Sequence, residues 1–174
     1  EALRLAFIHH KSLAVGLRGV HKQRTIGDTF EQSGSGETYI DLMDLGLLIG
    51  SGGVLSHAPR RAQSAMMMLD AFQPEGLTML AVDSIFMMPQ LGVLAQVHSG
   101  ASRQVFDRDC LIKLGSSISA AGPSGSAKPG DACLKVEIEV DGNKTAEEVP
   151  FGKIKLIPLA DGKSAKAVIS PARQ

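Results

Sequence analysis

The sequence predicts an α/β fold at residues 1–100, followed by a small β-rich barrel or sandwich at residues 101–174. In the first part, apolar residues at helical spacing lie on both sides of two short apolar runs, a pattern typical of strands that alternate with helices. After Gly100, short β-like runs are separated by Gly-Pro, Pro-Gly and Asp-Gly pairs, as in antiparallel sheets. The two patterns favour two domains with a boundary near residue 100.

The composition limits the classes of partner. Basic and acidic side chains number 18 each, so the formal net charge of the 174 residues is zero. We expect no nucleic-acid partner, because binding to phosphates needs an excess of basic residues. We expect no membrane segment, because no run approaches the roughly 18 apolar residues of a membrane span. Cys110 and Cys133 have no metal-binding spacing and are consistent with a reducing cytoplasm.

The first helix is predicted near the start of the chain. Five residues recur every three or four positions and therefore share one helical face: Leu3, Phe7, His10, Ala14 and Leu17. Residues 27–38 are polar and rich in Gly and Ser, and we interpret them as a loop.

The segment from Leu45 to Gly53 is the most informative part of the chain. Leu45–Ile49 is predicted as a strand covered on both faces, and it ends in Gly50, Ser51, Gly52 and Gly53. Glycines let backbone N–H groups approach a ligand, and the N-terminus of a following helix adds unpaired donors and a partial positive charge. This pattern is typical of nucleotide sites. A strand-to-helix turn without a ligand has the same pattern, and the glycines alone do not decide between the two.

A second helix is predicted after the glycines, with Ser56 as its N-cap and Pro59 in its first turn. The expected buried face consists of Ala62, Ala65, Met66, Leu69 and Phe72. We interpret the methionines at positions 66–68 as core residues rather than as an adaptable binding surface.

The rest of the first part contains one more strand and one more helix. Leu77–Asp83 is an apolar run that ends in an acid, and we predict it to be a strand. Ser84–Val97 is a helical stretch that breaks or begins near Pro89, and His98 closes it.

The C-terminal part contains four predicted strands, at residues 111–114, 133–140, 153–159 and 165–169. In the second of these, Leu134–Val140 alternates strictly between apolar and charged residues, and Asp141-Gly142 after it is typical of a hairpin turn. No constellation here has a catalytic pattern, and a serine triad confined to this part is impossible because no histidine follows His98. Four lysines are candidates for a partner-binding surface of one charge sign, although an ordinary solvated surface has the same pattern: Lys153, Lys155, Lys163 and Lys166.

The histidines predict no metal site, because no two of them are spaced i and i+4. His57 directly follows the glycine segment and its short apolar extension. It is therefore a candidate contact to the base or phosphate of a bound nucleotide, and the alternative is a bond to the end of a helix.

Four segments carry a resemblance to a known family: Leu48–Arg60, Leu69–Gly76, Leu80–Asp83 and Met87–Ala95, with a weaker similarity at Gly152–Leu159 and Pro171–Arg173. They resemble the MutL-type proteins encoded beside adenosylcobalamin-dependent aminomutases such as glutamate mutase. These GlmL-like proteins are unrelated to the DNA mismatch-repair protein of the same name. The resemblance covers most of the chain and is most specific between Leu48 and Ala95.

The resemblance implies an actin-like, ribonuclease H-like ATPase fold, of which this chain would be a fragment of the second domain within a longer protein. The full-length protein would bind ATP or ADP with Mg²⁺. Gly50, Gly52 and Gly53 would lie under the adenine and ribose, and Ser51 and His57 would be the nearest polar groups. No phosphate hairpin with its catalytic carboxylates is recognisable before Leu45. Asp83 matches a conspicuous position of the family motif without an evident role.

The function that the resemblance implies is that of a cytoplasmic reactivating chaperone for an adenosylcobalamin-dependent mutase, which would be its partner. Two alternatives are an interaction module without nucleotide binding and a small-molecule enzyme of α/β type. The sequence has no cluster of acid, base and nucleophile, which argues against the enzyme. We expect the isolated chain to hydrolyse no ATP, because phosphoryl transfer needs a magnesium site and a positioned nucleophile.

Overall fold

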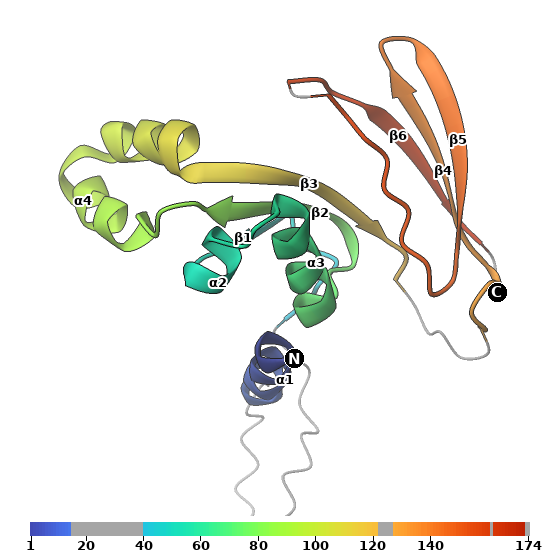
Figure 1. The fold of residues 1–174 in the computed structure, drawn as a ribbon, viewed down its shortest axis with the longest axis horizontal. Helices are drawn as coiled ribbons and strands as arrows, with labels where there is room; N and C mark the ends of the chain where they lie inside the picture. The colour runs from blue at the N-terminus through green and yellow to red at the C-terminus, as the bar shows by residue number, and fades with distance from the viewer. Residues whose placement is uncertain (15–39, 122–126, 161, 173–174) are drawn as a thin grey trace, which may run out of the picture. The chain divides into compact units, whose positions relative to one another are not determined.

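The computed structural model describes residues 1–14, 40–121, 127–160 and 162–172. The fold is mixed α/β with two three-stranded sheets (Figure 1). The chain divides into two compact units, Glu1–Ser119 and Ala120–Gln174. The change of pattern near Gly100 therefore lies inside the first unit. The reason is that β3 (Leu111–Ser119) has the sequence of a strand from a β-rich domain but pairs with the strand β2 (Gly76–Asp83) of the α/β unit.

The sheet of the first unit has the strand order β1-β2-β3. β1 (Leu47–Gly50) is parallel to β2, with Gly50 opposite Val82, whereas β3 is antiparallel to β2. Central β2 is buried from Leu80 to Asp83. β1 is a short edge strand of the described sheet, and Leu47 is 45% exposed. The expectation that the first strand is covered on both faces is therefore wrong, and only the second half of β2, Leu80–Asp83, is covered in this way.

α1 (Ala2–Leu13) packs on α3 (Arg61–Phe72). The rings of Phe7 and Phe72 meet edge-on, with their centroids 5.1 Å apart. The predicted first helix is confirmed in position, while Leu17 and the polar loop at residues 27–38 lie outside the described residues.

The core of the first unit forms where α3 and the one-turn helix α2 (Gly53–Ser56) meet the sheet. Its buried members are Leu55, Met68, Leu80 and Val82. α3 turns Ser64, Met68 and Ala71 inward, while Met66 is 42% exposed. The predicted helix is correct, and its predicted buried face is confirmed in part. Ala65, Leu69 and Phe72 pack half-buried against this core, whereas Ala62 and Met66 are exposed. The methionine interpretation holds for Met68 and fails for Met66.

α4 (Met88–Val105) begins with Pro89 in its first turn, as predicted, and extends beyond Val97. It is kinked at His98, whose backbone is not helical, with φ −150° and ψ 76°. The part after the kink is held against the first part by Ser102, whose hydroxyl donates to the carbonyl of Leu91 at 2.7 Å. His98 does not close the helix but accepts a hydrogen bond from the Ala101 N–H. A short π-helix, Phe106–Cys110, then leads into β3.

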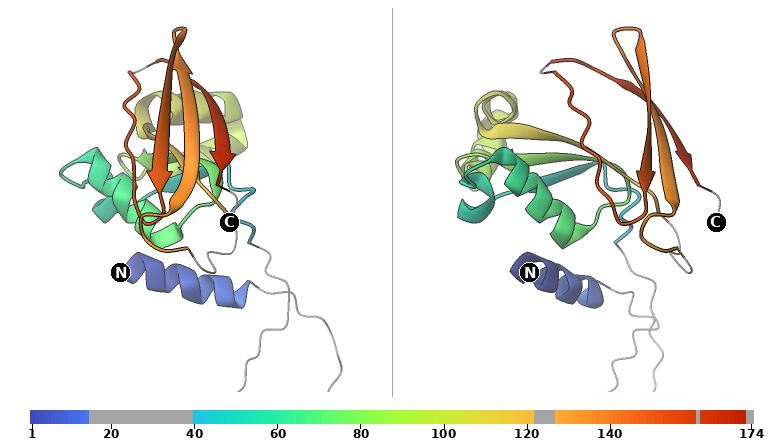
Figure 2. Two further views of the ribbon diagram at one scale, coloured as in Figure 1. Left: turned by 90° about the vertical axis from the view of Figure 1, so that its right-hand side faces the viewer. Right: turned by 45° about the vertical axis from the view of Figure 1, so that its right-hand side comes forward.

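The second unit has one antiparallel sheet with the strand order β5-β4-β6 (Figure 2). Its strands are β4 (Ala132–Val140), β5 (Asn143–Pro150) and β6 (Lys166–Pro171). The predicted hairpin turn is confirmed, since Asp141 and Gly142 both have positive φ, 50° and 84°, as a type I′ turn requires. Three strands form neither the expected barrel nor a sandwich within the described residues. The expected strand at residues 153–159 is absent there, because its alternating residues find no neighbouring strand to pair with.

Candidate functional site

The candidate site lies at the carboxyl edge of the parallel strand pair. β1 and β2 end side by side, so the segment Gly50–Gly53, here called the glycine turn, leaves the sheet beside Asp83. In α/β sheets, ligands bind outside the carboxyl ends of the strands. The sheet therefore brings the predicted glycine residues to the edge where a ligand is expected.

The three glycines of this turn serve different purposes. Gly50 is buried, and a Cβ there would lie 2.8 Å from Leu55 Cδ1 and 3.0 Å from Met68 Sδ. Gly52 has φ 95° and ψ 160°, a region that is essentially open to glycine only. A Cβ on Gly52 or Gly53 would meet no atom within 4 Å. Gly50 is therefore a packing residue, and only Gly52 and Gly53 border open space.

The helix that follows the glycine turn is shorter than predicted. α2 has four residues, and Ser56 is its last residue rather than the cap of a long helix. Pro59 lies before α3, whose start is stabilised by Gln63 Oε1, which accepts the Arg60 N–H at 3.0 Å. Because the helix dipole grows by adding aligned peptide units, a helix of one turn supplies little of the positive charge that the sequence suggested.

An open hollow of about 660 Å³ adjoins the glycine turn. Its volume is within the range of small-molecule sites. Backbone and side chains of α2, the following loop and α3 line it, among them Gly53, Val54, His57, Gln63, Met66 and Asp70. The structure therefore places His57 at the same hollow as Gly53, as the sequence suggested, although His57 itself is exposed.

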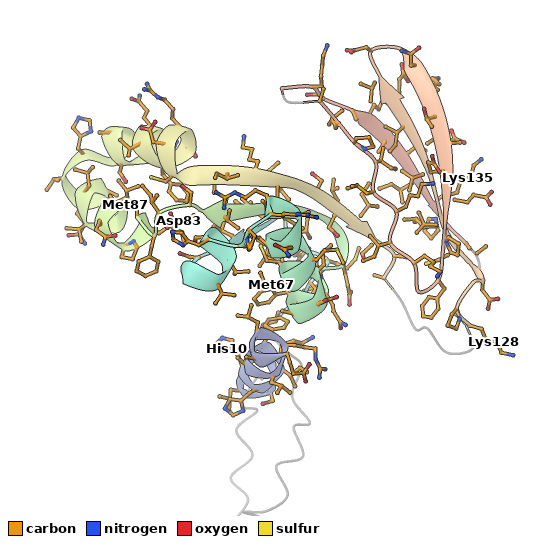
Figure 3. The ribbon with its side chains drawn as sticks, viewed as in Figure 1. His10, Met67, Asp83, Met87, Lys128 and Lys135 are labelled. Carbon is orange, nitrogen blue, oxygen red and sulfur yellow. The ribbon has the colours of Figure 1, made fainter. Side chains whose placement is uncertain are left out.

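Asp83 is fully buried at the end of β2. Its Oδ1 accepts the N–H groups of Ile85 and Met87 at 3.4 and 3.2 Å. Its Oδ2 accepts the N–H of Met88 at 3.0 Å and, more weakly, the hydroxyl of Ser51 at 3.5 Å. Figure 3 shows Asp83 and Met87 close together where β2 leads toward α4. Since a carboxylate accepts about four hydrogen bonds, this one has no acceptor position left for a ligand.

The charge of Asp83 is stabilised by the backbone. Burial alone would raise the pKa of this carboxyl group, but hydrogen bonds from the N–H groups of Met88, Met87, Ile85 and Phe86 outweigh it and hold the pKa below its usual value. Phe86 has φ 59°, a left-handed conformation that costs a non-glycine residue on the order of 1–3 kcal/mol. The structure thus accounts for the residue that the sequence left without a role: Asp83 anchors the start of α4.

Sequence reasoning missed a set of side chains that hold α2. The hydroxyl of Ser56 donates to the main-chain oxygen of Asp83, and the hydroxyl of Ser64 donates to the carbonyl of Leu55 at 2.7 Å. Arg61 Nη1 donates to the carbonyl of Ser56 at 2.7 Å. The available signal was Ser64 itself, a hydroxyl inside an apolar stretch of helix, where such a side chain bonds to a nearby carbonyl.

Two absences concern the described part of the chain. No three His, Cys, Asp or Glu residues in it are grouped so that they could hold a metal ion. None of its helices has the length and apolar character needed to cross a membrane.

The described residues place a glycine-rich turn at the carboxyl edge of a parallel strand pair in an α/β unit, the edge at which ligands bind in α/β sheets. The chain belongs to the MutL protein family, whose model matches residues 1–110, which end directly before β3. This family is the one associated with glutamate mutase, not the mismatch-repair protein, so the resemblance seen in the sequence is confirmed. Neither the curated proteins nor the solved structures include a match to the chain.

Proposed function

We propose that this chain is the C-terminal part of an ATP-dependent reactivating chaperone for an adenosylcobalamin-dependent aminomutase, and that it contributes the adenosine side of the nucleotide cleft. The family match over residues 1–110 carries the proposal, because the matched segment contains the glycine turn, the hollow and Asp83. The parallel β1–β2 pair with α2 and α3 between the strands is compatible with an actin-like, ribonuclease H-like second domain.

The residues present suit the adenosine part of a nucleotide. Gly52 and Gly53 offer backbone without a Cβ toward open space, and the adjoining hollow is large enough for a base and ribose. His57, Arg60, Gln63 and Asp70 are the polar residues that line the hollow, whereas Ser51 does not line it and bonds to Asp83 instead. Because Gly50 has no side chain, Leu55 and Met68 can pack directly against the backbone of the turn.

The residues present do not suit the Mg²⁺ that accompanies ATP. The carboxylate of Asp83 is filled by four donors, and the described residues contain no other group of metal ligands. The magnesium site and the hydrolytic residues would therefore come from the rest of the full-length protein. For this reason the isolated chain is expected to bind nucleotide weakly and to release no phosphate from ATP.

A matched pair of glycine substitutions tests nucleotide binding. Gly53→Ala and Gly92→Ala each add a methyl group to a helical glycine that has no atom within 4 Å of the new Cβ, so both variants should fold. Titration calorimetry with ADP should show at least about a tenfold loss of affinity for Gly53→Ala, equal to 1.4 kcal/mol, and no change for Gly92→Ala. Equal affinity in all three proteins, or no ADP binding by either the chain or a longer parent protein, would contradict the proposal.

The interaction module without nucleotide binding remains a second candidate because of the loop after β2. Ile85 and Phe86 are adjacent apolar side chains that are 58% and 53% exposed there, and Phe86 has a positive φ of 59°. The lysine surface of the second unit is weaker support, because Lys155 pairs with Glu147 at 2.9 Å and Lys163 with Asp141 at 3.0 Å. Binding of the mutase by a protein truncated after Ser119 would locate the contact in the first unit.

A further inference from the structure

The orientation of the glycine turn depends on α2, a helix that is too short to be stable by itself. α2 has a single turn, closed by the N–H groups of Leu55, Ser56 and His57, which donate to the carbonyls of Gly52 and Gly53. One helical turn is not stable alone, because the entropy lost in forming it exceeds what so few hydrogen bonds return. The position of α2 must therefore come from contacts with the rest of the unit.

Leu55 is the residue through which most of these contacts act. Its side chain is buried in the core with Met68 and lies directly beneath Gly50. Its carbonyl accepts the hydroxyl of Ser64, which projects from α3 and is 0% exposed. The hydroxyl of Ser56 donates to the main-chain oxygen of Asp83, and Arg61 donates to the carbonyl of Ser56, so the next residue of α2 is also held. Both the side chain and the carbonyl of Leu55 are thus anchored, and Gly52 and Gly53 follow immediately before it.

We propose that Ser64 is a positioning residue for the nucleotide site: by holding the carbonyl of Leu55 it fixes α2 and so presets Gly52 and Gly53 for a ligand. Ser64 lies in the core and does not line the hollow. A turn that is ordered before the ligand arrives loses less conformational entropy on binding, so its preset geometry raises the affinity. This inference rests on the proposed function.

The chain contains a matched control in Ser102. Its hydroxyl donates to the carbonyl of Leu91 at 2.7 Å, the same length as the Ser64 bond, and it is 7% exposed. Both serines lie in helices and bond to carbonyls on an earlier helical segment. Ser102, however, holds the two parts of α4 together and makes no hydrogen bond to the glycine turn or α2 in the described structure. Ser64→Ala and Ser102→Ala should therefore lower the melting temperature by similar amounts.

The experiment combines amide hydrogen exchange with ADP titration. In Ser64→Ala, the amides of Leu55, Ser56 and His57 should exchange about tenfold faster and the affinity for ADP should fall about tenfold, the effect of losing one buried hydrogen bond. In Ser102→Ala, both quantities should equal those of the wild type. A second variant, Arg61→Met, covers the case in which Ser64→Ala folds poorly. Arg61 is exposed, and its replacement removes the hydrogen bond to the carbonyl of Ser56. The exchange rates and the ADP affinity of Arg61→Met should change in the same direction as those of Ser64→Ala.

Two outcomes separate this inference from the proposed function. Unchanged exchange of the α2 amides in Ser64→Ala and Arg61→Met, or an equal loss of affinity in Ser102→Ala, overturns the positioning role. Absence of ADP binding by both the chain and a longer parent protein overturns the proposed function, and the exchange of the α2 amides then still decides whether Ser64 presets the turn.

Discussion

The glycine turn of the first unit and the β4–β5 turn of the second unit both depend on a glycine with positive φ, yet they are held in different ways. Gly142 lies in a two-residue turn between two strands that pair directly, and its partner Asp141 is exposed. Gly52 lies between β1 and α2, and the turn is fixed by Ser51, Ser56 and Ser64 through bonds to distant residues. The conformation of a turn that is held by its own residues should not depend on substitutions in the core. The conformation of a turn that is held by the core should depend on them, even where the substituted residue does not contact the turn.

The largest difference between the two turns is expected when the same substitution, Asp→Asn, is made at Asp83 and at Asp141. Asp83→Asn should lower the free energy of unfolding by about 3 kcal/mol, because an amide cannot accept all of the N–H donors and each hydrogen bond to a charged group contributes about 1.5–3 kcal/mol. Asp141→Asn should change it by less than about 0.5 kcal/mol, because asparagine suits a type I′ turn. Urea unfolding measures both values, and similar losses at the two positions would refute the distinction.

Acid should affect the first turn through Asp83. Because the folded-state pKa of this carboxyl group is lowered, its contribution is complete above the ordinary aspartate pKa of about 3.9 and is lost as the pH falls through the lower folded-state pKa. The stability difference between wild type and Asp83→Asn should be constant from pH 7 to about pH 5 and should shrink in stronger acid. A difference that stays the same down to pH 2 would mean that Asp83 is not ionised in the folded protein.

Packing beneath the glycine turn should give a smaller effect. Gly50→Ala should cost about 1–2 kcal/mol, because its Cβ would lie 2.8 Å from Leu55 Cδ1 and the core must shift to admit it. Gly46→Ala is the matched control, since a Cβ there meets no atom within 4 Å, and it should be nearly neutral. If thermal unfolding finds the two variants equally stable, the close packing at Gly50 is not important for the turn.

The smallest effect is expected at the surface of the second unit. Lys163→Gln removes the 3.0 Å ion pair with Asp141, both of whose members are exposed, and should change stability by less than about 1 kcal/mol. The difference should shrink further in 0.5 M salt, where the Debye length is only a few ångströms. A loss of several kcal/mol would show that the hairpin turn also depends on its surroundings.

Some elements were predictable from the sequence because their determinants are local. The hairpin at Asp141-Gly142 needs only two residues that accept positive φ between alternating strands, and Pro89 marks the start of α4 without reference to any neighbour. The buried face of α3 was predictable only in part: Leu69 and Phe72 do pack against the core, but the inward position of Ser64 depends on α2 and the sheet, which lie on that side. The partner of β3 was not predictable either, because a strand sequence does not specify which edge it joins.

For the candidate site, the sequence by itself determined the place of the glycine turn, the nearness of His57 and membership of the family. Only the tertiary structure decided that Gly50 packs the core, that Gly52 and Gly53 border open space, and that Asp83 and Ser64 serve as anchors. The physical reason is the reach of the interactions. A backbone conformation or a motif is encoded by adjacent residues, whereas the bonds that join Ser51 to Asp83 and Ser64 to Leu55 exist only once the sheet and α3 have brought these segments together.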